Sequence, residues 1–445
     1  MLRMPERSAW WPQVLCGCRC PRLTSRKTEP EGVDLVTAPC EESTGEYRQL
    51  RERVEAEAYV ASVCFRHGPP ELFGVELEWT VHYADDLSRP LEAADLAAAL
   101  GPHAPVALRD DSPHLPLPAG SPLSVEPGGQ VEISALPQRS LAELFTAVTA
   151  DTEVLAGLFD QAGFVLGTKA TDPYRTPRRV LETPRYSAME KAFEPIGPDG
   201  ITMMCNTAGL QLCVDVGETA TVAKRWTVLH ALGPVLIAAF ANSPETDALR
   251  TSWASSRMRA VLGTDPVRTW PAAVNADPVD TWVRRVLDTP LLCLRRSGDC
   301  WDAPRGVTFA DWIAGALDEP PSTDDLDYHI STLFPPVRPH GYFEVRYLDA
   351  QPGTRWLTPV CLLVALTATD QIIDEVLDIC SSVGNKWLPA AREGLNNPGL
   401  AAAARAVVEL GAGALSGIGL TDEMIALVHD DLDRLSQHVG GIHRS

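Results

Sequence analysis

A short segment of this chain, residues 74–80 with sequence GVELEWT, alternates acidic and large apolar side chains. In a β-strand, successive side chains point to opposite faces, so Glu76 and Glu78 share one face while their apolar neighbours share the other. Like charges on one sheet face repel each other unless cations lie among them, and carboxylate oxygens suit hard ions such as Mg²⁺. The pattern predicts a metal–nucleotide site on an antiparallel sheet. The alternative is that both are ordinary solvated strand glutamates.

A second segment, residues 125–134 with sequence VEPGGQVEIS, favours the metal site. It places Glu126 before a tight turn and Glu132 on the polar side of the strand that follows. Two adjacent glycines in that turn allow the backbone to approach a ligand closely. A fifth carboxylate, Glu344, lies far downstream, and Arg346 occupies the same face two residues later. A carboxylate for a metal beside a guanidinium for a phosphate suits phosphoryl transfer.

Composition limits the class of protein and its partners. The chain has 445 residues, of which 45% are hydrophobic and 22% are charged, as in ordinary globular proteins. Its formal net charge of -21 argues against nucleic acid or an anionic membrane surface as a partner. The longest apolar run, residues 228–241, contains His230, Gly233 and Pro234 and is too short to cross a bilayer. The N-terminus lacks the pattern of a signal peptide, so we expect a cytoplasmic protein.

The 11 cysteines show no disulfide-framework spacing. The CGCRC sequence at residues 16–20 lacks the two-residue gap and the histidine pair that zinc sites use, so we do not expect a metal there. Five other cysteines lie in apolar contexts and are predicted to be small core residues in a reducing compartment. These are Cys205, Cys213, Cys293, Cys361 and Cys380.

Hydrophobic periodicity predicts an α+β fold, in which a mainly antiparallel sheet is flanked by helices. Strands are expected at residues 72–81, 123–133, 203–216 and 342–348, and long helices at residues 46–64, 141–162 and 219–241. Residues 1–44 have no periodicity and are expected to be a disordered extension. Residues 45–445 are expected to form a single catalytic domain with a helical C-terminal part from about residue 359. The chain has no P-loop, no GxGxxG and no GxSxG sequence.

Six segments, read together, carry a resemblance to a known family. They are GVELE at 74–78, EPGGQVEIS at 126–134, PRYSAM at 184–189, MMCNTAGLQ at 203–211, ANSP at 241–244 followed by Arg257, and HISTLFPPVR at 329–338 leading to FEVR at 343–346. From about residue 71 to 352 the chain resembles the glutamate–cysteine ligases of the plant and proteobacterial type. That family belongs to the glutamine-synthetase-like carboxylate–amine ligases. Size and composition are similar to the actinobacterial members that open ergothioneine biosynthesis.

The resemblance implies a curved antiparallel sheet and a specific reaction. ATP phosphorylates the γ-carboxylate of L-glutamate, the amine of L-cysteine displaces phosphate, and γ-glutamylcysteine forms. Two or three Mg²⁺ ions and several arginines cancel the repulsion between the two anionic substrates. No covalent enzyme intermediate is required, and positioning and electrostatics dominate. We expect a monomer or weak dimer. Two alternatives remain: a ligase for another amine acceptor, and a non-catalytic relative that binds a metal or an amino acid.

The resemblance also implies roles for individual residues. The implied metal ligands are Glu76, Glu78, Glu126, Glu132, Gln211 and Glu344. Arg346 is expected to hold the transferring phosphoryl group beside Glu344, which makes these two the catalytic residues. The glutamate pocket is expected to include Arg185, Tyr186, Met204, Thr207 and Arg257. The nucleotide phosphates are expected to face Lys169, Arg178 and Arg179. Each role has an alternative. Gln211 could be an ordinary strand glutamine, and Arg185 and Arg257 could form surface ion pairs. The three cations assigned to the nucleotide phosphates could be solvated loop charges. The sequence does not indicate a base for the cysteine amine.

Overall fold

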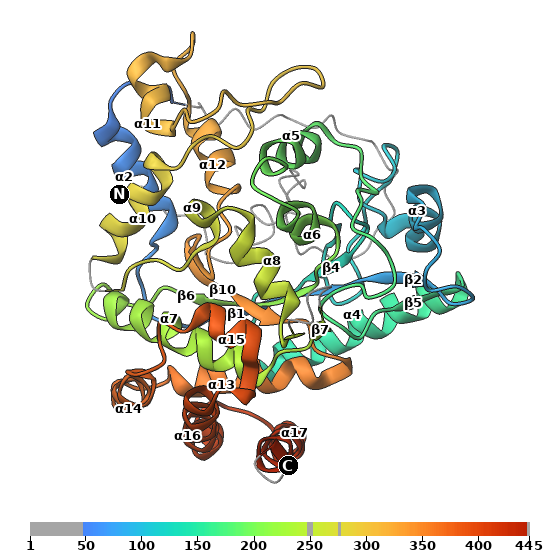
Figure 1. Ribbon diagram of the computed structural model, residues 1–445, viewed down its shortest axis with the longest axis vertical. Coiled ribbons are helices and arrows are strands. Elements are labelled where there is room, and N and C mark those ends of the chain that lie inside the picture. The colour runs from blue at the N-terminus through green and yellow to red at the C-terminus, as the bar shows by residue number, and fades with distance from the viewer. Residues whose placement is uncertain (1–47, 247–251, 275–276, 443–445) are drawn as a thin grey trace, which may run out of the picture.

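A six-stranded antiparallel sheet forms the centre of the protein (Figure 1). The computed structural model describes residues 48–246, 252–274 and 277–442. The strand order is β3-β4-β1-β6-β10-β9. These strands are β1 (Phe73–Trp79), β3 (Leu123–Val125), β4 (Val131–Ser134), β6 (Gly209–Asp215), β9 (Val337–Pro339) and β10 (Tyr342–Asp349). The α+β prediction is therefore confirmed, whereas the predicted N-terminal extension lies outside the described residues.

The register of the strands gives the sheet one polar face and one apolar face. Directly paired residues of antiparallel strands point to the same side. Glu76 pairs with Gln211, and Glu78 pairs with Glu132, so these side chains share a face. The opposite face is closed by buried apolar residues, among them Val75, Leu77, Ile133, Leu210, Leu212, Phe343 and Val345.

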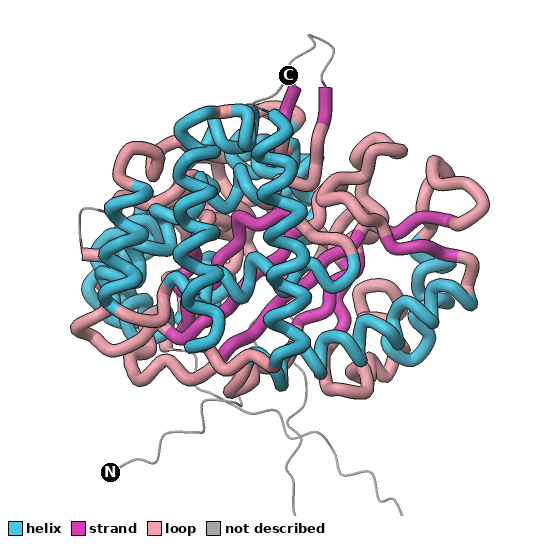
Figure 2. Tube along the Cα trace, turned by 90° about the horizontal axis from the view of Figure 1, so that it is seen from below, coloured by secondary structure: helices cyan, strands magenta, loops and turns pink. Residues whose placement is uncertain are grey.

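Helices cover the apolar face. Helix α7 (Val222–Ala239) packs against β10, and the Tyr347 hydroxyl donates a 3.1 Å hydrogen bond to the carbonyl oxygen of Leu229 on that helix. Figure 2, seen from the other direction, shows this helical layer in front of the strands. The layer continues through α13 (Leu357–Leu366), α14 (Asp370–Cys380), α15 (Trp387–Glu393), α16 (Pro398–Ala414) and α17 (Asp422–Ile442).

The polar face of the sheet faces a second group of helices. In Figure 1, helices α5, α6 and α8 stand on the side of the sheet opposite α7. Their bounds are α5 (Pro184–Phe193), α6 (Asp199–Cys205) and α8 (Ser256–Thr264), and α12 (Thr323–Ile330) lies in the same part of the fold. Three of them begin at side-chain N-caps: Thr183 for α5, Ser255 for α8 and Ser322 for α12.

A smaller lobe extends from one edge of the sheet. It contains a two-stranded sheet of β2 (Val81–Tyr83) and β5 (Phe164–Leu166), with α3 (Ala93–Leu100) and α4 (Leu141–Gln161) packed beside it. The remaining elements surround these layers. They are α2 (Arg53–Cys64), β7 (Glu245–Thr246), β8 (Ser252–Trp253), α9 (Pro266–Thr269), α10 (Pro278–Asp288), α11 (Phe309–Asp311) and a five-residue π-helix at Trp312–Ala316.

Three predicted strands differ from the structure. Residues 123–133 form the hairpin β3–β4 rather than one strand, because Pro127 and a positive φ of 88° at Gly129 reverse the chain. Residues 203–216 do not form one strand either: Met203 and Met204 belong to helix α6, and only Gly209–Asp215 is extended. The predicted strand 72–81 is divided at Thr80 between β1 and β2, which pair in different sheets.

Among the described residues, one helical stretch, Pro398–Gly417, is apolar and long enough to cross a membrane by length and composition alone. The buried side of α16 faces other helices, since α16 contacts α7 and α13. At Gly411, an added Cβ would lie 2.6 Å from the Leu362 side chain of α13. Close packing of this kind is typical of the core helix of a folded domain.

Candidate active site

Five carboxylates gather on and beside the polar face of the sheet. Glu76, Glu132 and Glu344 are buried there, and Glu78 and Glu126 are half-buried. The pairings of β1 with β4 and β6 confirm the prediction that Glu76, Glu78 and Glu132 share this face. Burying several negative charges together is costly unless cations neutralise them.

Glu76 is a buried carboxylate with an oxygen atom that is unpaired among the described residues. It is only 4% exposed, and its Oε1 atom has no hydrogen-bond partner within the described structure. Burial raises its pKa well above the ordinary value, and the charges of Glu132 and Glu344 raise the pKa further. An unpaired buried carboxylate oxygen, surrounded by other carboxylates, is the donor that a hard divalent cation needs. The residues of this face therefore fit a magnesium ion.

The hairpin β3–β4 supplies two further carboxylates. Burial raises the pKa of Glu132 to about 7, with a contribution from the negative charge of Glu78. The hydroxyls of Ser124 and Ser134 donate hydrogen bonds of 2.6 and 3.1 Å to Glu132 and partly oppose that shift. Burial, together with Glu132 and Glu78, raises the pKa of Glu126 to about 8.

Glu344 is the exception, because two arginines neutralise it. The Arg338 guanidinium binds both carboxylate oxygens, at 2.5 and 3.0 Å, and Arg346 donates to Oε1 at 2.8 Å. Burial alone raises the pKa of Glu344, but the two guanidinium groups more than reverse this and lower it to about 2. Our sequence interpretation missed Arg338 as a site residue, although it lies in the segment 329–338. No local sequence signal identifies it, because its contact with Glu344 depends on the pairing of β9 with β10.

A chain of polar contacts links Arg346 to Glu78 across the sheet. Arg346 donates to the Oε1 atom of Gln211, and the Gln211 amide donates to Glu78 Oε1 at 3.0 Å. The backbone N–H of Gly209 donates to the other Glu78 oxygen at 2.6 Å. The amide oxygen of Gln211, which we predicted as a metal ligand, therefore faces an arginine in this structure. Its metal role remains a prediction.

Two of the predicted glutamate-binding arginines come from helices above the polar face. Arg185 lies over the ring of Tyr328 at 4.9 Å and donates hydrogen bonds to the backbone oxygen and hydroxyl of Ser331, at 3.1 and 3.2 Å. Arg257 is 5% exposed and donates a 2.9 Å hydrogen bond to the carbonyl oxygen of Arg346, next to the carboxylates.

Other predicted pocket residues gather where α6 meets the β3–β4 hairpin. The buried amide of Gln130 donates hydrogen bonds to the carbonyl oxygens of Met204 and Thr207, at 3.3 and 2.9 Å. Tyr186 packs against the apolar cluster that includes Met204. The structure thus brings these residues to one region, but their predicted roles in binding glutamate remain predictions.

The glycines of the hairpin turn allow close packing within the protein. An added Cβ on Gly128 would lie 2.1 Å from the carbonyl oxygen of Cys205. An added Cβ on Gly129 would lie 2.4 Å from the Leu91 side chain. The absence of side chains therefore lets the turn pack closely against other parts of the protein, and Gly128 also lines the pocket described below, so its approach to a ligand remains a prediction.

The three predicted nucleotide cations make ion pairs or local hydrogen bonds. Arg179 is paired with Glu190 at 2.5 Å and with Glu182 at 2.8 Å. Lys169 donates a 3.4 Å hydrogen bond to Asn242, and Arg178 donates to the Leu91 carbonyl at 2.8 Å. No contact in the described residues tests their predicted roles, which remain predictions.

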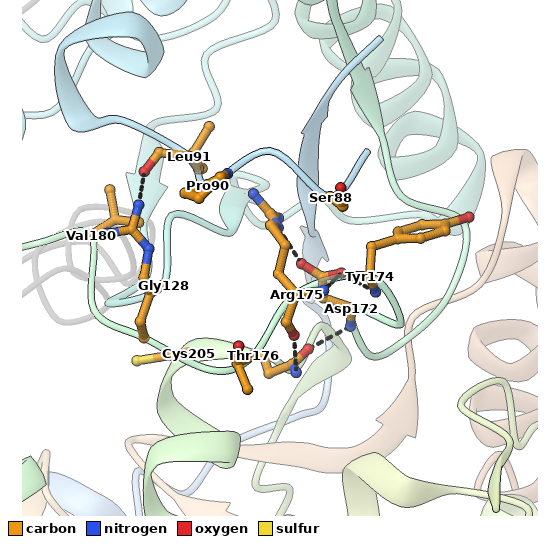
Figure 3. A pocket seen from close by; sticks show the side chains of 12 residues that line it. Ser88, Pro90, Leu91, Gly128, Asp172, Tyr174, Arg175, Thr176, Val180 and Cys205 are labelled. Carbon is orange, nitrogen blue, oxygen red and sulfur yellow. Dashed lines mark hydrogen bonds and ion pairs between the residues drawn. The ribbon is translucent and has the colours of Figure 1, made fainter. Parts of the chain in front are cut away.

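Arg178 lines a polar pocket of about 170 Å³ beside the hairpin turn (Figure 3). The loop that forms one wall is held by the buried Asp172, which accepts hydrogen bonds from the Tyr174 backbone at 2.8 Å and from Arg175 Nε at 2.6 Å. Lys169 and Arg179 are not among the residues that line this pocket.

We expect the stability of the metal-free protein to fall as pH rises from about 5 to about 8. The folded-state pKa values of Glu126 and Glu132 lie above the unfolded value near 4.5, so the folded state binds more protons in this window. Their stabilising contribution is complete below the unfolded pKa and is lost as pH rises through the folded pKa. Thermal melts in chelator at several pH values measure this slope.

The matched variant for this prediction is Glu132→Gln, which removes one of the titrating groups. Its melting temperature should depend less on pH than that of the wild type over the same range. If the two pH profiles are parallel, Glu132 does not carry a raised pKa in the folded protein.

Comparisons with known proteins show the family to which this chain belongs and agree with its fold. The profile of "Glutamate-cysteine ligase family 2 (GCS2)" matches residues 72–417. The chain is 36% identical over 368 residues to "Glutamate--cysteine ligase EgtA" of Mycolicibacterium smegmatis, covering 80% of this chain and 84% of that protein. It is 29% identical to the chloroplastic glutamate–cysteine ligase of Arabidopsis thaliana, covering 62% of this chain and 53% of that protein.

The fold is also similar to that of a solved structure, a bifunctional glutathione synthetase from Pasteurella multocida. The TM-score is 0.51 at 13% identity, over 89% of this chain and 52% of that chain. At that level of identity the likeness concerns the fold alone. The family profile covers more than half of the described chain, and the mycobacterial relative exceeds 30% identity over most of both proteins. This chain therefore belongs to the glutamate-cysteine ligase family 2.

Proposed function

We propose that this protein joins the γ-carboxylate of L-glutamate to the amine of L-cysteine in an ATP-dependent reaction, through γ-glutamyl phosphate. The product is γ-glutamylcysteine, and by resemblance to the actinobacterial enzymes it serves ergothioneine synthesis. The family assignment and the relatives named glutamate–cysteine ligase support this reaction. The observation that carries the proposal is the polar face of the sheet, where four carboxylates on paired strands lie beside Arg346.

The carboxylates and the arginines of this face have different proposed roles, namely metal binding and neutralisation of the phosphoryl group. Glu76, Glu78, Glu126, Glu132 and Glu344 are the residues that would hold magnesium ions, with Gln211 beside them. When bound, these ions supply positive charge to the polyphosphate and to the transferring phosphoryl group. Arg346 is positioned to neutralise the phosphoryl oxygens, since its planar guanidinium forms paired hydrogen bonds.

Arg185 and Arg257 are the candidates for holding the glutamate carboxylates, with Tyr186, Met204 and Thr207 around the same pocket. Lys169, Arg178 and Arg179 are the candidates for nucleotide contacts, and Arg178 is supported by its place in the pocket of Figure 3. We further propose a cytoplasmic monomer or weak dimer without nucleic-acid or membrane partners, consistent with the net charge of -21. Light scattering during size-exclusion chromatography tests the oligomeric state.

The reaction is tested by ADP release with omission of each component in turn. Turnover should require magnesium, glutamate and cysteine together, and mass spectrometry should identify γ-glutamylcysteine. A panel of other amines separates a cysteine ligase from a ligase for another acceptor. A non-catalytic relative would bind nucleotide or glutamate without releasing ADP, and that outcome would overturn the proposal.

We expect Arg346→Lys to lower kcat more than it raises the KM for glutamate. A lysine ammonium is a point charge and cannot reproduce the fork geometry of a guanidinium at a transferring phosphoryl group. Arg257→Lys should instead raise the KM for glutamate by about ten- to a hundred-fold, which is the cost of losing a charge-assisted contact of roughly 1.5–3 kcal/mol. Steady-state kinetics with each substrate varied distinguishes the two.

Arg139→Lys serves as a control in the same experiment, because Arg139 is exposed and pairs only with Glu71 at 2.9 Å among the contacts described. It should leave both constants near the wild-type values. Identical small effects of Arg346→Lys and Arg257→Lys on all three substrates would show that neither arginine has the role proposed.

A further inference from the structure

One cysteine, Cys213, belongs to a small buried apolar cluster with Leu72 and Tyr342 and also lies on the polar face of the sheet. Cys213 on β6 pairs directly with Glu344 on β10, so its side chain shares the face of the carboxylates. The Cys213 thiol, an oxygen of Glu76 and an oxygen of Glu344 all lie within 4.8 Å of one another. The prediction that Cys213 is a small buried residue is confirmed, and the register of β6 in addition places its thiol beside charged groups.

The three side chains form an enclosed donor set. Cys213 is 1% exposed and Glu344 is fully buried. The 4% exposed Glu76 directs into the cluster a carboxylate whose Oε1 atom has no partner within the described structure. The clustering of three donor side chains is one observation that points to a ligand. The unpaired Glu76 oxygen is a second one, since buried polar atoms are normally paired. The opposing cations, Arg338 and Arg346, contact Glu344 and not Glu76.

The chemistry of the donors selects a class of ion. Magnesium takes oxygen ligands, so the Cys213 sulfur adds nothing to its binding. Zinc and similar thiophilic divalent ions accept thiolate and carboxylate ligands together, usually in tetrahedral geometry with an open position for water. Donor atoms around such an ion lie roughly 3.5 Å apart. The three donor atoms lie within 4.8 Å of one another, so binding an ion requires the side chains to close by no more than about an ångström.

We propose that Glu76, Cys213 and Glu344 form a binding site for a thiophilic divalent ion of the zinc and cadmium class. The ion takes Glu76 away from the site of the hard cation, so the two kinds of ion compete. Ion binding itself is independent of the proposed ligase function, whereas its consequence, reversible inhibition of turnover, rests on that function.

Binding is tested with Cd²⁺, because a cadmium–thiolate bond gives a charge-transfer absorption band in the ultraviolet. Cys16, Cys18, Cys20 and Cys40 lie outside the described residues and Cys300 is exposed, so all proteins compared carry serine at these five positions to remove other thiols from the titration. In this serine-substituted parent protein, the band should saturate at one bound Cd²⁺ per protein molecule. The band should be absent in Cys213→Ser. The matched control is Cys361→Ser, because Cys361 is fully buried in α13 among apolar residues, and it should keep the band.

Equal bands in the parent and in Cys213→Ser would overturn the proposal. If Cys213→Ser fails to give a cooperative thermal melt, Glu76→Gln replaces it. That variant keeps the thiol but removes one ligand, so it should weaken the cadmium affinity by at least about ten-fold. Unchanged affinity in Glu76→Gln would also overturn the proposal. In the parent, excess Mg²⁺ should raise the Cd²⁺ concentration needed for half saturation.

The consequence for turnover is measured with 2-aminobutyrate as the amine acceptor, because it lacks the thiol with which cysteine would chelate the ion. The Cd²⁺ concentration that halves each protein's own rate should be at least about ten-fold higher in Cys213→Ser than in the parent. Equal concentrations would show that inhibition arises elsewhere. If no acceptor supports ADP release, the proposed ligase function fails, while the absorption titration still decides whether the metal site exists.

Discussion

Glu76→Gln is expected to remove nearly all ligase turnover while raising the thermal stability of the metal-free protein. The carboxylate is buried and repelled by Glu132 and Glu344, so its replacement by a neutral amide relieves a cost of folding. The same replacement removes a ligand for the hard cation. We expect turnover to fall by roughly two to three orders of magnitude, as when one electrostatic stabiliser of a catalytic site is lost.

The measurements are kcat with saturating magnesium and the melting temperature in chelator. Glu57→Gln is the matched control, because Glu57 lies half exposed on α2 and pairs with Arg53 of the same helix. Its effect on stability should be within about 0.5 kcal/mol, with turnover unchanged. A Glu76→Gln protein with near-normal turnover and unchanged stability would mean that Glu76 is only a strand glutamate without a metal role.

Arg338→Met should cause the largest loss of stability among the substitutions considered. Arg338 binds both oxygens of the fully buried Glu344, and its removal leaves that carboxylate with Arg346 as its remaining cationic partner among the described contacts. Breaking a buried ion pair typically costs about 3–5 kcal/mol, because one charge stays buried without compensation. Because Arg346 remains, we expect a decrease of about 3 kcal/mol in the free energy of unfolding, measured by urea denaturation.

The pH dependence of this loss gives a second test. The Glu344 pKa is about 2 in the folded protein, below its ordinary value. The stabilising contribution of Glu344 is therefore present above the unfolded pKa and lost as pH falls through the folded pKa. The stability difference between wild type and Arg338→Met should accordingly shrink between pH 5 and pH 2. In Arg139→Met, loss of the exposed pair with Glu71 should cost less than about 1 kcal/mol at all these pH values.

The sequence allowed the polar face to be predicted because strand alternation is a local property. Glu76 and Glu78 share a face through the pleat of one strand, and Gln211 falls on the polar side of β6 by the same rule. The α+β class follows from the same periodicities. These predictions required only residues that lie a few positions apart in the sequence.

What could not be predicted depends on contacts between distant segments. The partnership of Arg338 with Glu344 requires the register of β9 on β10, which includes a tight turn between the two strands. The position of Cys213 beside Glu76 depends on three neighbouring strands at once. The tight turn before Glu132 was predicted, but residues 123–133 were still expected to form one strand, because pairing of the two short strands across the turn is not visible in local periodicity. In each case the deciding interaction is tertiary, and local propensity does not encode it.

The strand order of the sheet has a consequence for how the protein forms during synthesis. β1 pairs with β4 and β6, which leave the ribosome well before β9 and β10, yet the latter carry Arg338 and Arg346. A nascent chain that stops short of β10 contains the repelling carboxylates without the guanidinium groups that balance them. Such contacts between distant segments close late and slowly. We therefore expect the sheet to gain its final order only when the last two strands dock, so that folding and completion of the site are one event.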